Sequence, residues 1–214
     1  MSGRVGPLAG IVLAAGGSRR MGRPKQLLAL AGRPLLQHVL DAAAASALAE
    51  IVLVLGHEAS AVAAALDLPA RARVVVNDAW AAGQGTSLAC GVRAVAAGEG
   101  IAAAVLLGDQ PGVDAALVDA MIAAFRATDA AAVRPVWRDA DGAARPGHPV
   151  VLGRELFAEA ATLAGDQGAR VLFARAPERL REIALAGAPP PDVDEPEDYR
   201  RVTDAAQMTQ TGGL

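Results

Sequence analysis

The feature that most constrains this chain is a short apolar run near its start that ends in a loop rich in glycine and cations. Residues 8–15 are apolar and bounded by glycines, which is typical of a buried parallel strand. The following loop holds Gly16, Gly17 and Gly22 with basic residues between them. Glycine lets backbone amides approach a ligand closely, and successive amides form a concave anion site. The pattern therefore predicts a polyphosphate-binding loop at the carboxyl end of a first strand.

The spacing of this loop excludes two common phosphate-binding motifs. A P-loop needs Gly-Lys followed by Ser or Thr, whereas Lys25 lies between a proline and a glutamine. A dinucleotide fingerprint needs G-x-G-x-x-G leading directly into a helix, and residues 16–18 do not supply it. The plain alternative is a basic surface loop without a ligand, which the length and regularity of the pattern disfavour.

The rest of the chain alternates apolar runs with helical patterns. Strands are expected at 50–55, 73–76 and 102–107, and helices at 34–46, 59–66, 86–97 and 115–127. Such alternation predicts βαβ units and a mostly parallel sheet. Two strands from residue 131 onwards, 131–137 and 147–152, follow each other without a helix, which favours an antiparallel excursion. A helix at 154–163, a short helix from the segment 165–170, an edge strand at 180–185 and a last helix from about residue 197 complete the chain.

We therefore expect a single-domain, three-layer α/β/α, Rossmann-like fold. The domain should span residues 1–206, with 207–214 as a disordered tail. The length of 214 residues suits one such domain, and its 53% hydrophobic but only 3% aromatic residues favour small aliphatic side chains packed in layers. A net charge of −3 suggests neither a nucleic-acid nor a membrane surface. The single Cys90 and the absence of a signal-peptide pattern predict a cytoplasmic protein.

Carboxylates follow the predicted strands where a metal–phosphate complex would bind. Ligands of open α/β sheets lie outside the carboxyl ends of the strands, and Asp109 follows strand 102–107 there. Its oxygens suit Mg²⁺ or Mn²⁺; the alternative is a simple turn cap. A second ligand could be Asp192 or Asp194, for which capping the helix after Pro196 is the alternative. Lys25 supplies a compact charge for a departing pyrophosphate.

The segment LAAGGSRRMGRPK resembles the opening motif of the MobA-like nucleotidyltransferases, and more narrowly that of the molybdenum cofactor cytidylyltransferases of the MocA type. GDQP resembles the metal-binding motif of this family. PDVDEPEDY resembles its late acidic motif, although Glu195 replaces a threonine, which removes a hydroxyl from that segment. PGHPV matches the Gly-His-Pro motif on the strand expected to face the second substrate.

The resemblance implies a set of site residues. The implied catalytic residues are Lys25, Arg20 and Asp109, the implied metal ligands are Asp109 and Asp194, and His148 is implied at the acceptor substrate. Implied nucleotide contacts are Leu13, Ala14, Ala15, Gly16, Gly17, Ser18, Arg19, Gly22, Asn77, Gln84, Gly85 and Ser87. Asn77, Gln84, Gly85 and Ser87 lie in a second loop, NDAWAAGQGTS, which follows the strand at 73–76, and a capped helix start is the alternative for this loop. Asp166 and Arg170 match another family motif, but a local cap-and-turn role explains them equally well.

The implied reaction is transfer of CMP from CTP to the phosphate of the molybdopterin cofactor, with release of pyrophosphate and dependence on Mg²⁺ or Mn²⁺. The product would serve a molybdenum hydroxylase apoenzyme of the xanthine dehydrogenase type. Guanylyl members carry LAGG where this chain has LAAG, so Ala15 favours CTP. The alternatives are the same fold using GTP or another phosphorylated acceptor (a sugar phosphate or a small acid), and a non-catalytic carrier of the molybdenum cofactor.

Overall fold

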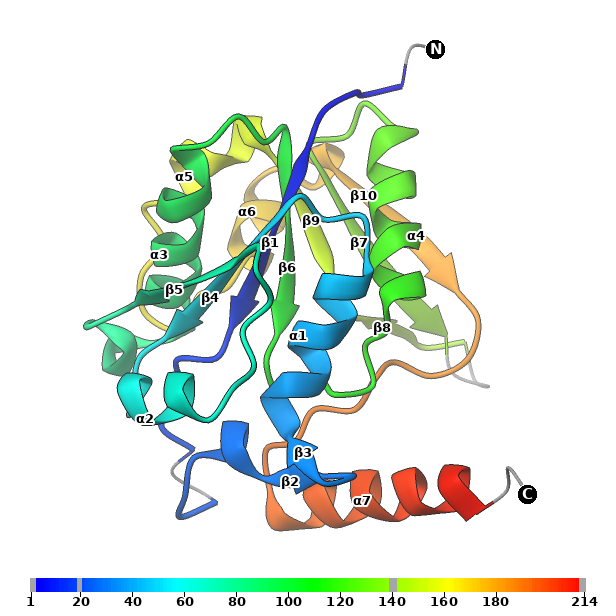
Figure 1. The fold of residues 1–214 in the computed structure, drawn as a ribbon. Coiled ribbons are helices and arrows are strands. Elements are labelled where there is room, and N and C mark those ends of the chain that lie inside the picture. Colours follow the sequence, from blue (N-terminus) through cyan, green and yellow to red (C-terminus); the bar gives the residue numbers. More distant parts are fainter. Residues whose placement is uncertain (1–2, 19–20, 139–141, 212–214) are drawn as a thin grey trace.

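The structure, a computed structural model, describes residues 3–18, 21–138 and 142–211. Its centre is an eight-stranded sheet in the order β10-β7-β9-β6-β1-β4-β5, with β8 paired to β7 (Figure 1). The pairs β1–β4, β1–β6, β4–β5 and β7–β10 are parallel. β9 runs antiparallel to β6 and β7, and β8 runs antiparallel to β7. The predicted mostly parallel sheet with a small antiparallel excursion is therefore confirmed.

The strands are short, and the carboxyl ends of the parallel strands β1, β4 and β6 are aligned. Their bounds are β1 Leu8–Leu13, β4 Glu50–Leu55, β5 Ala72–Val76, β6 Ala102–Leu107, β7 Ala132–Arg138, β8 Ala144–Pro146, β9 Val150–Gly153 and β10 Leu180–Leu185. Leu13 pairs with Val54 of β4 and with Leu107 of β6, so these three parallel strands end at one edge of the sheet. The loops that follow them are thereby brought together.

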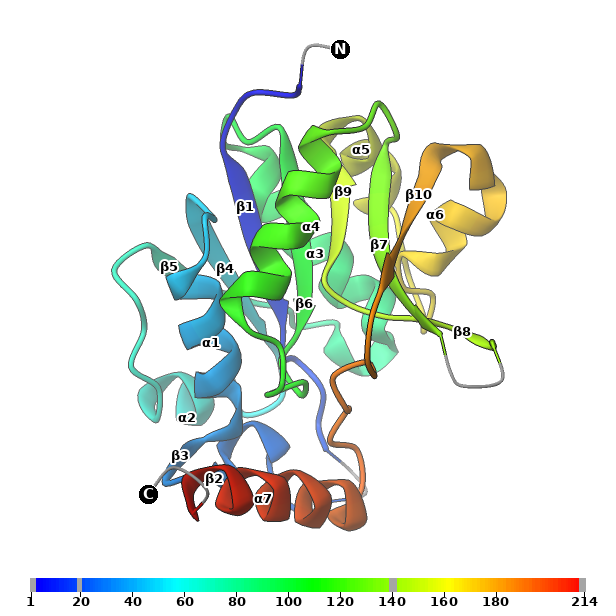
Figure 2. The ribbon, with the colours of Figure 1, turned by 90° about the vertical axis from the view of Figure 1, so that its right-hand side faces the viewer.

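Helices cover both faces of the sheet and give the predicted three layers (Figure 2). One face carries α1 (Leu35–Ala45), α2 (Ala59–Ala64) and α4 (Ala115–Arg126); the other carries α3 (Gln84–Ala96), α5 (Phe157–Ala160) and α6 (Arg170–Arg175). Each face has its own buried core, the first including Leu36 and Phe125 and the second including Leu88 and Phe157. Aliphatic side chains dominate both cores, as the composition predicts.

A small substructure closes the edge where β1 and β6 end. It contains the hairpin β2 (Ala29–Leu30) and β3 (Arg33–Pro34), which sequence patterns did not predict, and the last helix α7 (Pro196–Thr211). The hydroxyl of Tyr199 in α7 donates a hydrogen bond to the carbonyl of Ala29 at 2.5 Å. α7 thus packs beneath the sheet, as both views show.

Two predicted helix boundaries need correction. α3 begins at Gln84 and not at Thr86, because the Thr86 hydroxyl lies inside the first turn and donates to the Gly83 carbonyl at 2.8 Å. The helix expected at 154–163 is a 3₁₀ turn, Arg154–Leu156, followed by the short α5. α7 continues through Thr211, past the predicted domain end at 206, so the extent of the domain stays a prediction. Asp114 caps the start of α4, since its carboxylate accepts from the Leu117 amide at 2.8 Å.

Among the residues the structure describes, no helix combines the length and the apolar character needed to cross a membrane.

Candidate active site

A cleft of about 710 Å³ lies at the carboxyl ends of β1 and β6. It is bounded by the opening loop, the start of α3, the turn after β6 and the segment that precedes α7. Many of the predicted site residues meet there, namely Leu13, Ala14, Ala15, Gly16, Gly17, Lys25, Gln84, Ser87, Asp109 and Asp194. The aligned strand ends explain this convergence of segments that are distant in sequence.

Gln26 fixes the shape of the opening loop. Its side chain is only 3% exposed, and Nε2 donates to the carbonyls of Ala14 at 2.8 Å and Gly16 at 2.9 Å. Ser18 adopts a left-handed backbone conformation with φ 48°, which costs energy for a residue with a side chain. Its Oγ accepts from the Lys25 amide at 2.9 Å, which holds both residues in place. The sequence analysis missed Gln26, for which an amide side chain directly after Lys25 was the available signal.

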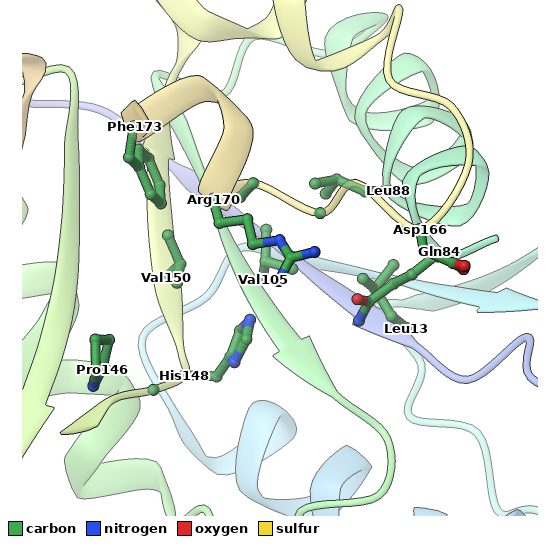
Figure 3. A pocket seen from close by; sticks show the side chains of 13 residues that line it. Leu13, Gln84, Leu88, Val105, Pro146, His148, Val150, Asp166, Arg170 and Phe173 are labelled. Atoms are coloured by element: carbon green, nitrogen blue, oxygen red, sulfur yellow. The ribbon is translucent and has the colours of Figure 1, made fainter. Parts of the chain in front are cut away.

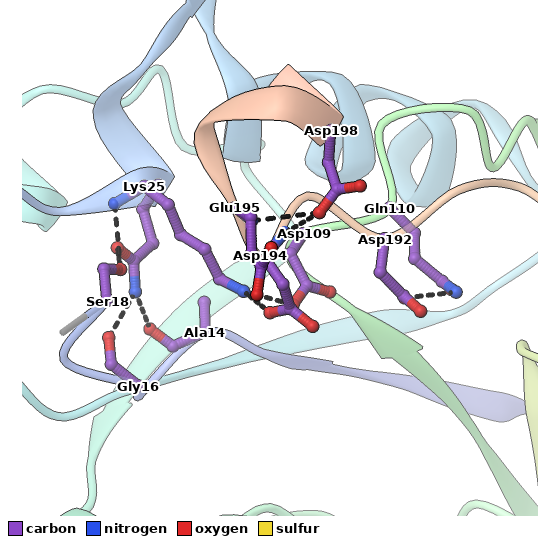
Figure 4. Close-up of polar contacts among 11 residues, drawn as sticks. Ala14, Gly16, Ser18, Lys25, Asp109, Gln110, Asp192, Asp194, Glu195 and Asp198 are labelled. Atoms are coloured by element: carbon purple, nitrogen blue, oxygen red, sulfur yellow. Dashed lines mark hydrogen bonds and ion pairs between the residues drawn. The ribbon is translucent and has the colours of Figure 1, made fainter. Parts of the chain in front are cut away.

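Lys25 joins two carboxylates that are far apart in the sequence (Figure 4). Its Nζ donates to Asp109 Oδ2 at 2.6 Å and to Asp194 Oδ1 at 2.7 Å. The Lys25 side chain is only 15% exposed, and it is the only lysine of the chain. Burial alone would lower its pKa, but the charges of Asp109 and Asp194 outweigh burial and raise the pKa above its usual 10.5. Lys25 is therefore a permanent cation between two carboxylates.

The second oxygen of Asp109 suits a divalent cation. Asp109 Oδ1 is buried and has no hydrogen-bond partner among the described residues, which is costly for a carboxylate. Carboxylate oxygens are preferred ligands of Mg²⁺ and Mn²⁺. Within the described part of the chain, no group of three or more His, Cys, Asp or Glu side chains could hold a metal alone. A metal at Asp109 would thus have at most one further carboxylate ligand and would take the others from phosphate and water, as Mg²⁺ commonly does.

Asp192 and Asp194, the two candidates for the second metal ligand, have different hydrogen-bond partners. Asp192 accepts a hydrogen bond from the buried Gln110 amide at 2.8 Å, and burial, followed by the charge of Asp109, raises its pKa. Asp194 instead shares Lys25 with Asp109. The amide of Val193 between them donates to the Asp109 carbonyl at 3.0 Å, so the acidic segment is tied to the turn after β6. Because Asp194 and Asp109 accept from the same ammonium, the geometry favours Asp194 over Asp192 as the second carboxylate beside Asp109.

The second loop is held by its own side chains and by the backbone of residues 165–167. Asn77 is buried, and its Nδ2 donates to Thr86 Oγ1 at 2.9 Å and Ser87 Oγ at 3.0 Å. The Gly85 amide donates to the Gly165 carbonyl at 2.8 Å, and a Cβ on Gly85 would lie 2.7 Å from the Gln167 carbonyl oxygen. Asn77 thus holds the start of α3, and Gly85 permits close backbone approach.

Several predicted nucleotide contacts therefore lie outside the cleft lining or outside the described structure. Gly22, Asn77 and Gly85 do not line the cleft, and Ser18 supports Lys25 from behind. Arg19 and Arg20 fall outside the described residues. Contacts of these residues with a nucleotide stay predictions.

Trp80 is a cleft residue that the sequence analysis left without a role. A Cβ on Gly17 would lie 3.0 Å from the Trp80 ring, and the centroids of the Trp80 and His57 rings are 5.0 Å apart. Its ring therefore backs the opening loop and also lines the cleft, where it offers a flat apolar surface. A tryptophan in a glycine-bearing loop of an aromatic-poor chain was the available signal.

A second pocket of about 290 Å³ adjoins the cleft (Figure 3). Both cavities share Leu13, Gln84 and Asp166 in their linings. His148 lines this second pocket, and so does Arg170, whose role the sequence left open. Burial lowers the pKa of His148 to about 4, against the opposing charge of Asp109, so its imidazole is neutral near pH 7.

Most of the chain, including most of this site, is similar to a known family. Residues 10–181 match the family described as the MobA-like NTP transferase domain. The chain belongs to the MobA-like NTP transferase family. The opening loop, the Asp109 turn and the His148 strand of this family member all lie within the matched residues.

Three relatives extend the comparison. The nicotine blue oxidoreductase of Paenarthrobacter nicotinovorans is 35% identical over 172 residues, covering 79% of this chain and 83% of that protein. The crystal structure of Rv0371c from Mycobacterium tuberculosis is 35% identical, with a TM-score of 0.79 and coverage of 93% and 99% of the two chains. A complex of Rv0371c with manganese is 34% identical, with a TM-score of 0.76 and coverage of 94% and 100%.

A further solved structure is that of a nucleotidyl transferase from Methanothermobacter. It is 25% identical, with a TM-score of 0.73, and the alignment covers 95% of this chain and 99% of that one. The sheet and its helices therefore form a Rossmann-like nucleotidyltransferase fold.

Proposed function

We propose that this protein transfers CMP from CTP to the phosphate of the molybdopterin cofactor. The observation that carries the proposal is the Lys25–Asp109–Asp194 cluster in the cleft of a MobA-like NTP transferase. Lysine and carboxylates at the carboxyl ends of parallel strands suit a triphosphate with its metal. The choice of CTP and of the molybdenum cofactor rests on the resemblance of LAAGGSRRMGRPK to the MocA type.

The proposed step is a displacement at the α-phosphorus. An oxygen of the acceptor phosphate forms a bond to this phosphorus, and the bond to the oxygen bridging the α- and β-phosphates breaks. Pyrophosphate leaves with that electron pair, and the product contains a new phosphoanhydride. A phosphate monoester is already an anionic nucleophile, so neither a serine nor a strong base is required. Alignment and charge neutralisation then supply the catalysis.

Each residue of the cluster has a distinct part in this proposal. Asp109 and Asp194 would hold Mg²⁺ or Mn²⁺, which would neutralise charge on the triphosphate. Lys25 would exchange its carboxylate contacts for the departing pyrophosphate, where its charge is most valuable. Backbone amides of Gly16 and Gly17 would approach the phosphates. The product would pass to a molybdenum hydroxylase apoenzyme of the xanthine dehydrogenase type.

The direct test is an assay of pyrophosphate release with each NTP in turn, in the presence of Mg²⁺ or Mn²⁺ and the molybdenum cofactor. We expect release with CTP that depends on both the metal and the acceptor. A preference for GTP would contradict cytidylyl transfer and leave nucleotidyl transfer standing. Binding of CTP without pyrophosphate release, for any acceptor phosphate supplied, would favour the non-catalytic carrier.

The relative from Paenarthrobacter nicotinovorans favours a second candidate, an oxidoreductase, because its name states such an activity. In this candidate a reduced nicotinamide dinucleotide, bound without the G-x-G-x-x-G fingerprint that residues 16–18 do not supply, would pass a hydride to an oxidised substrate in the adjoining pocket. The measurement is oxidation of NADH or NADPH with a quinone-type acceptor, without CTP or metal. Retained hydride transfer in Asp109→Asn would distinguish this reaction, since hydride transfer needs no metal-bound triphosphate.

A further inference from the structure

Asp194 is the more exposed of the two carboxylates that share Lys25. Its side chain is 51% exposed, against 22% for Asp109. Its backbone lies in the irregular segment between β10 and α7, and its carboxylate is held by the ion pair with Lys25 at 2.7 Å. Under the proposed function, Lys25 leaves this ion pair for the departing pyrophosphate. Asp194 then needs a second support that persists through the exchange.

Asp198, in the first turn of α7, supplies such a support through the backbone (Figure 4). Its Oδ2 accepts from the amide of Glu195 at 2.9 Å and from the amide of Asp194 at 3.2 Å. Its Oδ1 lies 3.4 Å from a guanidinium nitrogen of Arg201. The two amides, that of Glu195 most, lower the pKa of Asp198 below its usual range. Asp198 is thus an anion that fixes two successive amides, one of which belongs to a carboxylate of the cleft.

The residue on the other side of Asp194 is anchored as well. Val193 is fully buried in one apolar cluster with Leu28 and Leu35, and its amide donates to the Asp109 carbonyl at 3.0 Å. The backbone of Asp194 therefore lies between an anchor on the Asp109 turn and an anchor on α7. Neither anchor uses the Lys25 ammonium, so both persist when that ammonium leaves.

Ordinary helix capping explains only part of the Asp198 contacts. Glu195 directly precedes α7 and Asp198 is the third helical residue, which is the spacing of a capping box. A full capping box has a Ser or Thr hydroxyl at the first position, and Glu195 has no hydroxyl. Asp198 also takes the amide of Asp194, which lies outside a capping box. These contacts therefore fasten the acidic segment to α7 as well as capping the helix.

We propose that Asp198 is a positioning residue for the divalent metal, because it fixes the backbone of Asp194 and so keeps the Asp194 carboxylate beside Asp109 when Lys25 leaves. The inference rests on the proposed function, in which Asp109 and Asp194 hold the metal. Asp198 itself touches neither the metal nor the nucleotide. A carboxylate on a fixed backbone binds a metal more tightly than one on a mobile backbone, because binding then costs less conformational entropy.

The test compares two substitutions of Asp198 that remove the same charge. Asn keeps an oxygen that can accept from both amides, whereas Ala has none. Affinity for Mn²⁺ alone, measured by electron paramagnetic resonance, is the first readout, and the thermal unfolding midpoint is the second. Asp194→Ala is the reference for loss of a metal ligand. Asp204→Asn, which removes an exposed carboxylate on the same helix, is the control for charge alone.

We expect Asp198→Ala to weaken Mn²⁺ binding by about tenfold, which is typical for loss of a group that orients a metal ligand. Asp198→Asn should weaken it by less than about threefold, and Asp204→Asn by less than about twofold, because an exposed charge is screened. Asp198→Ala should also lower the unfolding midpoint by about 2–4 °C, since α7 loses a capping contact.

A double substitution separates positioning from helix capping. In Glu195→Thr/Asp198→Ala, the new hydroxyl can accept from the amide of residue 198 and cap α7. It leaves the amides of residues 194 and 195 without the Asp198 carboxylate. The unfolding midpoint should therefore recover, while Mn²⁺ binding stays about tenfold weaker than in the wild type. Recovery of both would make Asp198 a helix cap only and would overturn the inference.

The remaining outcomes separate this inference from the proposed function. Equal weakening by Asp198→Ala and Asp198→Asn would overturn the inference, because charge and not hydrogen bonding would then matter. Unchanged Mn²⁺ affinity in Asp198→Ala, with affinity lost in Asp194→Ala, would overturn it while the proposed metal site stands. Unchanged affinity in Asp194→Ala would refute that metal site and the inference with it. The expected order of affinities, in a protein that releases no pyrophosphate with any NTP, would support the positioning role and refute the transfer.

Discussion

The nucleotide cleft and the adjoining pocket use charge in opposite ways. In the cleft, the Lys25 ammonium is paired with Asp109 and Asp194, and the Gln26 amide is paired with loop carbonyls. In the pocket, Arg170 has no partner among the described residues and faces apolar walls. A ligand of the cleft must exchange existing ion pairs, whereas a ligand of the pocket supplies a missing one. Because of this difference, the cleft is suited to select a metal bound to a triphosphate. The pocket is suited to select a ligand by its shape and by a single negative charge.

The largest effect should come from Asp109, which pairs with Lys25 and is proposed to hold the metal. Asp109→Asn should lower pyrophosphate release at saturating CTP by at least about a hundredfold, the cost of losing one preorganised charge contact of about 3 kcal/mol. The thermal unfolding midpoint should change little, because Asp109 lies at the rim of the cleft. Asp204→Asn, on the exposed surface of α7, is the control. Activity within threefold of the wild type would make Asp109 a turn residue only.

The pocket side can be examined through the pH dependence of stability. The pKa of His148 is lowered in the folded protein to about 4, from 6.5. The unfolded chain therefore binds the proton more readily between these values, so stability is complete above about pH 6.5 and falls as the pH drops towards 4. Between about pH 7 and pH 4.5, wild type should lose about 1–3 kcal/mol more unfolding free energy than His148→Gln, measured with urea. Equal losses would place His148 in a solvated environment.

Lys25→Met would break the ion pairs that distinguish the cleft from the pocket. Without the ammonium, the two carboxylates repel each other, and a metal no longer has to displace a cation. Affinity for Mn²⁺ without nucleotide should rise by about tenfold, while pyrophosphate release should fall. Manganese electron paramagnetic resonance would give the affinity. In wild type labelled with ¹⁵N-lysine, the only lysine signal should shift when Mg²⁺ binds. Unchanged or weaker Mn²⁺ binding in the variant would show that Lys25 does not compete with the metal.

The smallest effect should come from Ala15, which tunes the cleft by size and not by charge. Ala15 is buried and lines the cleft, and its carbonyl accepts from the His57 amide at 3.1 Å. Ala15→Gly should reduce the preference for CTP over GTP by about fivefold, or about 1 kcal/mol, since one methyl group discriminates weakly. Pyrophosphate release with both nucleotides measures the ratio. A wild-type preference for GTP would remove the basis of this prediction.

The sequence by itself determined the main strands of the sheet and the edge of the sheet at which the cleft lies. Residues 50–55 and 102–107 were predicted as strands with the bounds that the structure shows, because buried parallel strands are short, continuous apolar runs between glycines and polar residues. Asp109 was predicted at a ligand-binding edge from its position after such a strand alone. Local pattern suffices for these features because backbone geometry and burial act over a few residues.

Only the tertiary structure decided how the polar side chains pair. Lys25 contacts Asp109 and Asp194, which are 84 and 169 residues away, while Asn77 turns inward to the start of α3. Arg170 lies in a pocket because β9 brings His148 opposite α6. Such partnerships depend on which segments the packed sheet places together, and charged or amide side chains with several possible partners carry no local signal of which one they meet. The physical reason is that hydrogen bonds and ion pairs form through space after the chain has folded.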